Sequence, residues 1–219
     1  MVQVDSDHYS SKYQTAERFQ LYYHLFKTII DLNPVNALEI GIGSGVLTHL
    51  LRQNGVIVTG ADFDPSLKPE IIADIRKLPF EEDVFDTVIA SQVLEHIPFS
   101  DVNVALKEMC RVAKRYCIIT VPFNQHNVTF YCSTKVNKYL GFRGLLNRII
   151  DKYGSFCVNY GISKSSTTFV ADGEHQWEIG YRDYPIDSVR SVILEYAEII
   201  SEFRIPLSPY HYLFVLKKR

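Results

Sequence analysis

Three glycines at alternate positions give the sequence its strongest chemical signal. Gly41, Gly43 and Gly45 follow an apolar stretch at residues 37–40 and precede a run with helical spacing. Glycine permits positive φ angles and lets a ligand approach the backbone closely. A helix that begins after such a turn directs unsatisfied N–H groups toward whatever binds there. The pattern therefore predicts a ligand site between a strand and a helix.

Two residues beside the turn distinguish between possible ligands. The dinucleotide fingerprint G-x-G-x-x-G would place its third glycine where this chain has Val46. Glu39 stands just before the turn, and a carboxylate there would repel a pyrophosphate. The same carboxylate suits an ammonium group or ribose hydroxyls. These two positions argue against a dinucleotide, although an acid at the ribose position would also fit an NAD-dependent oxidoreductase.

The segment 39–45 resembles the first motif, E/D-x-G-x-G-x-G, of the class I S-adenosylmethionine-dependent methyltransferases of the type 11 kind, without a departure. The resemblance implies a Rossmann-like three-layer α/β sandwich with a mostly parallel seven-stranded sheet, whose last strand is antiparallel. It also implies S-adenosylmethionine as cofactor and S-adenosylhomocysteine as product. Specific motifs support it over about residues 35–122, and the closing elements support it by pattern only.

The resemblance assigns cofactor contacts to strand ends. Asp62 would hold the ribose, Asp74 would accept a hydrogen bond from the adenine amino group, and Ser91 and Gln92 would border the sulfonium. Asp64 is a rival to Asp62, but an Asp-Pro pair is typical of a turn. The full predicted set of cofactor-binding residues is Tyr13, Glu39, Gly41, Gly43, Gly45, Asp62, Phe63, Asp74, Ile75, Ser91, Gln92 and His96.

Histidines are the candidates for proton removal from an acceptor hydroxyl. We predict His175 first, then His126 and His96, although a packing role for His96 is the alternative. The predicted substrate contacts are Asn124, His126, Trp177 and Glu178. Residues 175–178 resemble an H-x-W-E-like segment of methyltransferases that act on surface saccharides. An edge strand with a buried Trp177 is the other interpretation.

Periodicity predicts the elements that position these residues. Helical spacing of apolar residues predicts helices over 15–32, after the glycine turn, over 101–114 and over 186–197. Strands are expected over 37–40, 56–61, 71–73, 85–90, 116–121, 198–205 and 211–217. The link after Asp62 is short and carries two prolines, so we expect only a stunted helix there. Alternation of strands and helices predicts parallel strands with ligands at their carboxyl ends.

The segment 123–173 exceeds what a minimal fold needs, and loops of that size are usually functional. Six lysines and arginines face two aspartates there, a local charge of +6 − 2 = +4, and aromatic residues are interleaved. Residues 134–153 can be drawn as a helix. That helix would cover the pocket as a lid, or rest its basic amphipathic surface on an anionic membrane or a lipid-linked substrate.

Composition narrows the function classes. The 219 residues carry a formal charge of −2, so no nucleic-acid partner is expected. The four cysteines show no zinc-site spacing, and we predict no metal. The sequence shows neither a signal-peptide pattern nor a run long enough to span a membrane, which predicts a cytoplasmic protein. Oligomeric state is left open.

We expect a single methyltransferase domain over residues 1–219. Its parts would be an N-terminal cap helix at 1–34, the cofactor-binding core at 35–122, a substrate lid insertion at 123–182, and a closing helix and two strands at 183–219. The predicted activity is methyl transfer, with oxygen of a small-molecule or saccharide acceptor as the target. An NAD-dependent oxidoreductase and a non-catalytic binding module of the same fold are the alternatives.

Overall fold

The computed structural model describes residues 14–125, 127–133, 155–161, 167–171 and 173–219. Its helices are α1 (Ala16–Asp31), α2 (Val46–Gln53), α3 (Val102–Val112) and α5 (Ile186–Tyr196), with short 3₁₀ turns η3 (Pro65–Leu67), η4 (Leu94–His96) and η5 (Phe99–Asp101). Its strands are β1 (Asn36–Ile40), β2 (Ile57–Asp62), β3 (Ile71–Ile72), β4 (Phe85–Ser91), β5 (Ala113–Pro122), β6 (Asn127–Ser133), β7 (Ser155–Gly161), β8 (Ala197–Ile205) and β9 (Ser208–Lys218).

Seven strands form the central sheet, in the order β3-β2-β1-β4-β5-β9-β8. Strands β1 to β5 pair in parallel, and β9 runs antiparallel to both of its neighbours. The register aligns Ile40 with Ala61 and with Ala90, so β1, β2 and β4 end at the same edge. The predicted sheet, with its reversed last strand, is confirmed.

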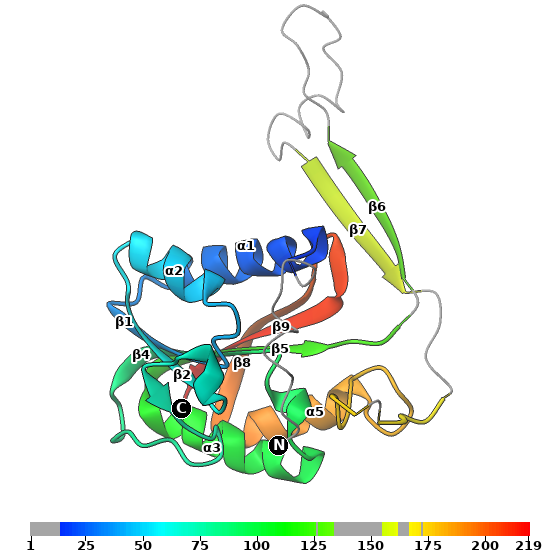
Figure 1. The fold of residues 1–219 in the computed structure, drawn as a ribbon. Coiled ribbons are helices and arrows are strands. Elements are labelled where there is room, and N and C mark those ends of the chain that lie inside the picture. The colour runs from blue at the N-terminus through cyan, green and yellow to red at the C-terminus, as the bar shows by residue number, and fades with distance from the viewer. Residues whose placement is uncertain (1–13, 126, 134–154, 162–166, 172) are drawn as a thin grey trace, which may run out of the picture.

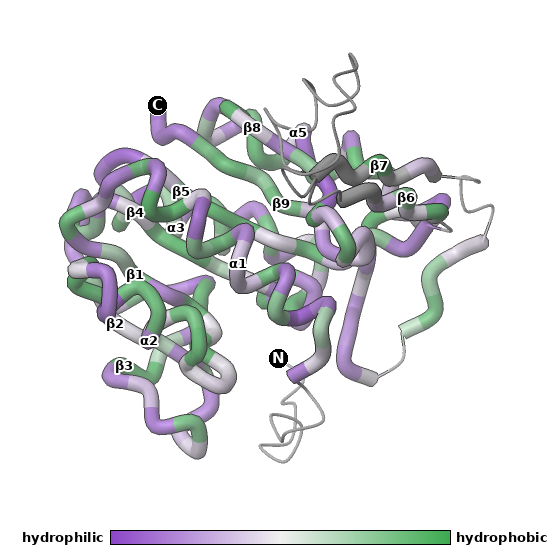
Figure 2. The backbone as a smooth tube through the Cα atoms, turned by 90° about the horizontal axis from the view of Figure 1, so that it is seen from above, coloured by the Kyte–Doolittle hydropathy of each residue, from purple (hydrophilic) through white to green (hydrophobic). Residues whose placement is uncertain are grey.

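Helices cover both faces of this sheet (Figure 1). Alternate residues along the strands enter two separate cores because successive side chains point to opposite faces. One core joins α1 and α2 to the sheet through Leu21, Leu25 and Leu47, and the other joins α3 and α5 through Met109 and Ile193. The middle of β9, between β5 and β8, is strongly hydrophobic (Figure 2). The three-layer arrangement predicted from the sequence is therefore present.

Local sequence signals set the element boundaries. Thr15 caps α1 by accepting a hydrogen bond from the Arg18 N–H at 3.3 Å. The chain leaves α1 through Asn33, which has a positive φ of 50°, just before Pro34. Between β2 and β3 the helix is reduced to the three residues of η3. The predicted stunted helix is confirmed.

The segment after β5 contains a structure that the sequence did not predict. Strands β6 and β7 pair antiparallel as a two-stranded ribbon that extends away from the central sheet (Figure 1). Val128 opposes Tyr160 and Phe130 opposes Val158, and all four side chains are exposed. The predicted helix over 134–153, with its lid and membrane alternatives, lies outside the described residues. Among the helices that the structure describes, none is long and apolar enough to cross a membrane.

The α1 face of the sheet offers a direct test of this packing. Leu25 is fully buried against the sheet, so Leu25→Ala should lower the free energy of unfolding by about 2–5 kcal/mol through lost burial and the cavity left behind. Leu194→Ala is the matched control, because Leu194 is 45% exposed on α5, and it should cost less than about 1 kcal/mol. Urea unfolding measures both. Equal losses for the two variants would contradict this placement of α1.

Candidate functional site

The glycine turn has a backbone that side chains would disrupt. Gly41, Gly43 and Gly45 have positive φ angles of 75°, 50° and 71°, a region that residues with a Cβ rarely adopt. A Cβ on Gly41 would lie 2.4 Å from Cγ2 of Val93. Gly45 caps α2 in the left-handed conformation. The three glycines thus allow the chain to reverse directly from β1 into α2.

A cavity opens over this turn at the carboxyl ends of β1, β2 and β4. It is lined by Arg18, Tyr22, Leu25, Glu39, Ile40, Gly41, Ile42, Gly43, Ser44, Leu47, Asp62, Phe63, Asp64, Leu67, Ala73, Ile75, Ser91, Gln92, Val93 and His96. Nine of the twelve predicted cofactor residues are among these. Of the other three, Gly45 is the residue that caps α2, Asp74 does not line the cavity, and Tyr13 lies outside the described residues.

Glu39 is a buried acid in the cavity wall. It is 4% exposed and accepts a hydrogen bond from the Thr48 hydroxyl of α2. Burial raises the pKa of the Glu39 carboxyl to about 7, although the Thr48 donor and the charge of Arg52 act in the opposite direction. A carboxylate kept out of water in this way favours a ligand that brings a positive charge or hydrogen-bond donors.

Asp62 ends β2 on the opposite side of the same turn. Burial raises its pKa, and backbone N–H groups of Asp64, Gly43 and Ile42 offset part of that effect. The Asp64 N–H donates to Asp62 Oδ1 at 3.0 Å. Asp64 itself accepts from the Ser66 N–H at 2.8 Å and caps η3, which is the turn role expected for it. Asp64 therefore has the predicted turn role, and the ribose contact of Asp62 stays a prediction.

Asp74 forms an ion pair with Arg76 beside the cavity wall. Its carboxylate accepts hydrogen bonds from the Arg76 guanidinium at 2.6 Å and 3.0 Å and from the Arg76 backbone N–H at 2.9 Å. These donors lower the pKa of Asp74, and Arg76 also pairs with Asp101 at 2.7 Å. Among the described residues, Ala73 and Ile75 line the cavity and Asp74 does not. The adenine contact that the resemblance implies for Asp74 stays a prediction.

Strand β4 supplies the far wall of the cavity. Ser91 Oγ lies 2.9 Å from the hydroxyl oxygen of Thr120 on β5, and Gln92 Nε2 donates to the same oxygen at 3.2 Å. Gln92 has a φ of 56°, which turns the chain sharply at this point. The sequence prediction missed Thr120, and also Arg18 and Tyr22, which reach the cavity from α1. Only pairing across strands and packing of α1 reveal these contacts.

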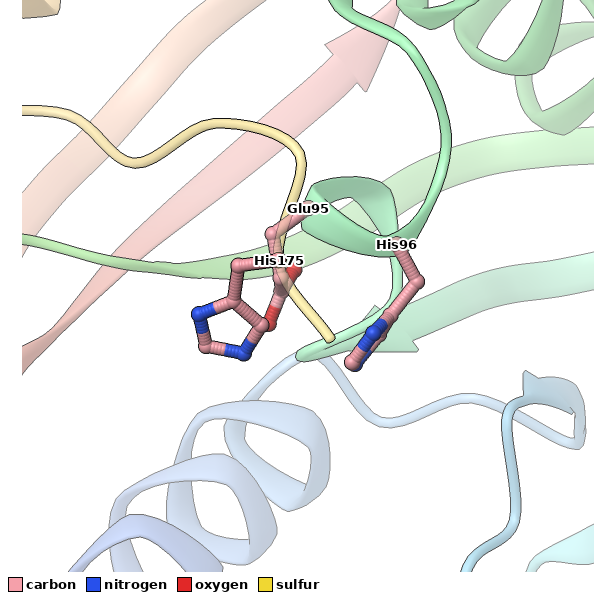
Figure 3. Close-up of side chains that lie close together, drawn as sticks. All are labelled: Glu95, His96 and His175. Carbon is pink, nitrogen blue, oxygen red and sulfur yellow. The ribbon is translucent and has the colours of Figure 1, made fainter. Parts of the chain in front are cut away.

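Two of the three predicted histidines meet at the edge of the cavity. The rings of His96 and His175 have centroids 5.1 Å apart, and Figure 3 shows both beside Glu95. His96 Nδ1 lies 2.9 Å from the carbonyl oxygen of Glu174, and His175 Nδ1 lies 2.7 Å from Glu178 Oε1. His126 lies outside the described residues. His96 thus makes the hydrogen bond that the structural alternative predicts, and it also lines the cavity. Its role in proton removal stays a prediction.

The predicted substrate contacts separate into different places. Trp177 is fully buried, and its indole N–H donates to the carbonyl oxygens of Leu94 and Ile97 at 3.1 Å and 3.2 Å. Its ring packs against Phe99, so it belongs to the core and not to a substrate wall. Glu178 is 6% exposed and supports His175. Asn124 lines a second hollow with Phe123, Gln125, Ser208, Pro209, Tyr210, His211 and Glu17.

Comparison with known proteins places this geometry in a family. The family model described as "Methyltransferase domain" matches residues 38–121, the stretch that contains the glycine turn, Asp62 and η4. Residues 38–121 are a methyltransferase domain. The resemblance drawn from the segment 39–45 is confirmed.

Curated relatives match over the same part of the chain. The demethylmenaquinone methyltransferase of Mycolicibacterium paratuberculosis is 31% identical over 107 residues, which are 43% of this chain and 46% of that protein. The ubiquinone biosynthesis O-methyltransferase of Saccharophagus degradans is 30% identical over 102 residues, 33% of this chain and 43% of the relative. This chain thus aligns with less than half the length of the curated relatives it matches.

Solved structures share the fold of the methyltransferase domain and its surroundings. The 1,6-didemethyltoxoflavin-N1-methyltransferase of Burkholderia thailandensis, solved with bound S-adenosylhomocysteine, superposes with a TM-score of 0.60. The alignment covers 97% of this chain and 82% of that chain at 13% identity. At this identity the likeness concerns the fold.

The buried Glu39 predicts a pH dependence of stability. Its pKa is about 7 in the folded protein against an ordinary 4.5, so the folded state holds the proton more tightly. The free energy of unfolding should therefore fall as pH rises from ~5 to ~8, by up to about 3 kcal/mol from this group. Glu39→Gln keeps an acceptor for Thr48 but cannot ionise, so it should remove this part of the fall. Urea unfolding at both pH values measures it, and parallel pH profiles for the two proteins would contradict the assignment.

Proposed function

We propose that this protein transfers the methyl group of S-adenosylmethionine to an oxygen atom of a small-molecule or saccharide acceptor. The observation that carries the proposal is one cavity, above the glycine turn, into which two buried acids on neighbouring strand ends, Glu39 and Asp62, both extend. S-Adenosylhomocysteine is the released product.

The charges of the cavity support this cofactor. S-Adenosylmethionine carries an ammonium group and a sulfonium, and its ribose offers two hydroxyl donors. The buried carboxylates of Glu39 and Asp62 match those groups, because charge-assisted hydrogen bonds are strongest where water is excluded. Phe63 and Ile75 supply apolar surface in the same cavity for an adenine ring. The Burkholderia protein, which shares this fold, was solved with bound S-adenosylhomocysteine.

The residues of the turn and the cavity disfavour the two rival functions. A pyrophosphate over the glycine turn would lie close to the buried carboxyl group of Glu39. This argues against an NAD-dependent oxidoreductase. A binding module that had lost its activity would be expected to have lost glycines or strand-end acids, and the turn keeps all three glycines together with Glu39 and Asp62.

The chemistry asks little of the protein beyond positioning. The cofactor supplies an activated methyl group, and the acceptor oxygen must be held about 3 Å from the methyl carbon, opposite the sulfur. The acceptor hydroxyl must also lose its proton. We assign that task to the pair of His175 and His96 at the cavity edge, with His175 first, because Glu178 fixes the orientation of its ring.

Oxygen as the acceptor atom and a small acceptor rest on further observations. The relative from Saccharophagus degradans carries an O-methyltransferase name in ubiquinone biosynthesis. A histidine pair beside the cavity fits removal of a hydroxyl proton. The saccharide alternative rests on the segment 175–178, in which His175 hydrogen-bonds to Glu178 and packs beside His96 while Trp177 packs in the core.

The division of the chain follows from this function. We propose a single methyltransferase domain over residues 1–219, with a cap at 1–34, a cofactor core at 35–122, a substrate insertion at 123–182 and closing elements at 183–219. Arg18 and Tyr22 of α1 reach the cofactor cavity, which supports the cap. His175 returns from the insertion to the cavity edge, which supports a substrate role for that part.

Calorimetry can test the cofactor assignment. S-Adenosylhomocysteine should bind the purified protein, and NAD at millimolar concentration should not. Asp62→Asn should weaken S-adenosylhomocysteine binding by about 10–100-fold, because it removes a charged acceptor from the ribose position. Asp31→Asn is the matched control, since Asp31 forms an exposed pair with Lys27 on α1, and its affinity should stay at the wild-type value. Binding of NAD but not of S-adenosylhomocysteine would overturn the proposal.

A further inference from the structure

A cluster of three side chains beside the cofactor cavity suggests more than proton transfer. Glu95 and His96 come from η4, and His175 comes from the segment that returns from the insertion (Figure 3). One ligand atom from each residue lies within 4.8 Å of the other two. His96 also lines the cofactor cavity. The cluster is therefore next to the place where an acceptor meets the methyl group.

Glu95 is the unexplained member of this cluster. Its side chain is fully buried, and neither carboxylate oxygen has a hydrogen-bond partner among the described residues. Burial raises the pKa of its carboxyl to about 7; the Glu95 backbone N–H and the charge of His175 act to lower it, and Glu178 acts to raise it. Buried carboxylates in proteins are normally paired, hydrogen-bonded or bound to a metal. Methyl transfer from the cofactor does not by itself require an acid here.

The two histidines are oriented as ligands. The Nδ1–H of His175 donates to Glu178 Oε1 at 2.7 Å, and the Tyr210 hydroxyl donates to the same oxygen at 2.7 Å. The Nδ1–H of His96 donates to the carbonyl oxygen of Glu174 at 2.9 Å. A neutral imidazole with its proton on Nδ1 carries a lone pair on Nε2. Metal-binding histidines typically use a carboxylate or a backbone carbonyl in this way to fix the ring and its tautomer.

We propose that Glu95, His96 and His175 bind a divalent transition-metal ion at the edge of the cofactor cavity. Two imidazoles and one carboxylate suit zinc, manganese, iron(II) or cobalt better than magnesium or calcium, which prefer oxygen ligands alone. Ligand atoms around such an ion are about 3.3 Å apart at metal–ligand distances of about 2.0–2.1 Å. Side-chain shifts of less than about 1 Å would close this cluster on an ion.

This proposal departs from the sequence prediction of no metal, which considered cysteine pairs and the spacing of histidines. The cluster uses no cysteine, and α3, β5 and most of the insertion lie between His96 and His175 in the sequence. A Glu-His dipeptide after a strand is not a recognisable metal motif by itself. The fold makes the site by returning residue 175 to η4, where the Gln176 N–H donates to the carbonyl oxygen of Glu95 at 2.8 Å.

The ion would define the substrate class, and this step rests on the proposed methyl transfer. Three protein ligands leave coordination positions for a substrate. Two adjacent hydroxyls, as in a catechol or a sugar cis-diol, would fill them together. With Nε2 of both histidines on the ion, the ion would take over the proton-removal task assigned to them above, because a hydroxyl beside a divalent cation releases its proton to water more easily. Its oxygen then attacks the methyl carbon, the carbon–sulfur bond breaks, and the electron pair stays on sulfur, giving a neutral thioether.

Cobalt(II) binding to the full-length, untagged protein tests the metal site without any substrate. After treatment with a chelator, the wild type should bind one Co²⁺ per chain and gain visible d–d absorption. Glu95→Gln and His175→Ala should each weaken binding at least about tenfold, and Glu178→Gln should weaken it about tenfold through the loss of ring orientation. Circular dichroism and thermal melting report whether each variant is folded. His49→Ala is the matched control, because His49 is exposed on α2, and its affinity should be unchanged.

The outcomes separate this proposal from the proposed activity. A wild type that shows no d–d absorption at millimolar Co²⁺ overturns the metal site, as does wild-type affinity in folded Glu95→Gln. S-Adenosylhomocysteine binding is measured on the same samples and should change less than about twofold with chelator. Co²⁺ binding in a protein that ignores S-adenosylhomocysteine would support the metal site while the methyltransferase proposal fails.

Discussion

Three carboxylates buried at one edge of a parallel sheet are the constraint on which the site depends. Glu39, Asp62 and Glu95 each follow or end a strand, each is nearly inaccessible to water, and each has a raised pKa caused mainly by burial. Such burial costs free energy unless donors or cations accompany it. For Glu39 and Asp62 the fold supplies a Thr48 hydroxyl and turn N–H groups. A bound ligand would supply the remaining hydrogen-bond donors or positive charge.

Parallel pairing produces this concentration of charge. Because β1, β2 and β4 end in register, the turns after them open at the same place, and the residues there are close in space although distant in sequence. The glycine turn keeps this place open, since a Cβ on Gly41 would meet Val93 from the β4 turn. The same packing that makes glycine obligatory therefore connects the cofactor turn to η4, where the histidine cluster begins.

The sequence predicted most of what periodicity and local turns determine. Four helices, a mostly parallel seven-stranded sheet with its reversed last strand, and nine cavity residues followed from apolar spacing and from the family resemblance. The pairing of Asp74 with Arg76, two residues later, did not follow from the motif, because a resemblance implies a ligand contact and says nothing of a neighbouring side chain. The sequence left Trp177 open between a substrate contact and a buried position and did not single out Glu95, because both outcomes depend on η4 meeting a segment about eighty residues away. The β6–β7 ribbon lies within the segment 123–182, which the sequence predicted as a substrate lid insertion.

The base of the insertion is closed by contacts between the chain that leaves β5 and the chain that returns before α5. Phe123 and Ile179 form a parallel β-bridge. The Asn124 N–H donates to the Ile179 carbonyl oxygen at 2.8 Å, and the Ile179 N–H donates to the Pro122 carbonyl oxygen at 3.2 Å. Gly180 follows with a φ of 100°, and a Cβ there would lie 2.2 Å from the Asn124 carbonyl oxygen. The chain therefore leaves and returns at one closed point. His175 and Glu178 lie just before this point in the chain, beside Gln176 and Trp177, which donate hydrogen bonds to η4. These contacts hold the two residues in place whatever the length or shape of the ribbon.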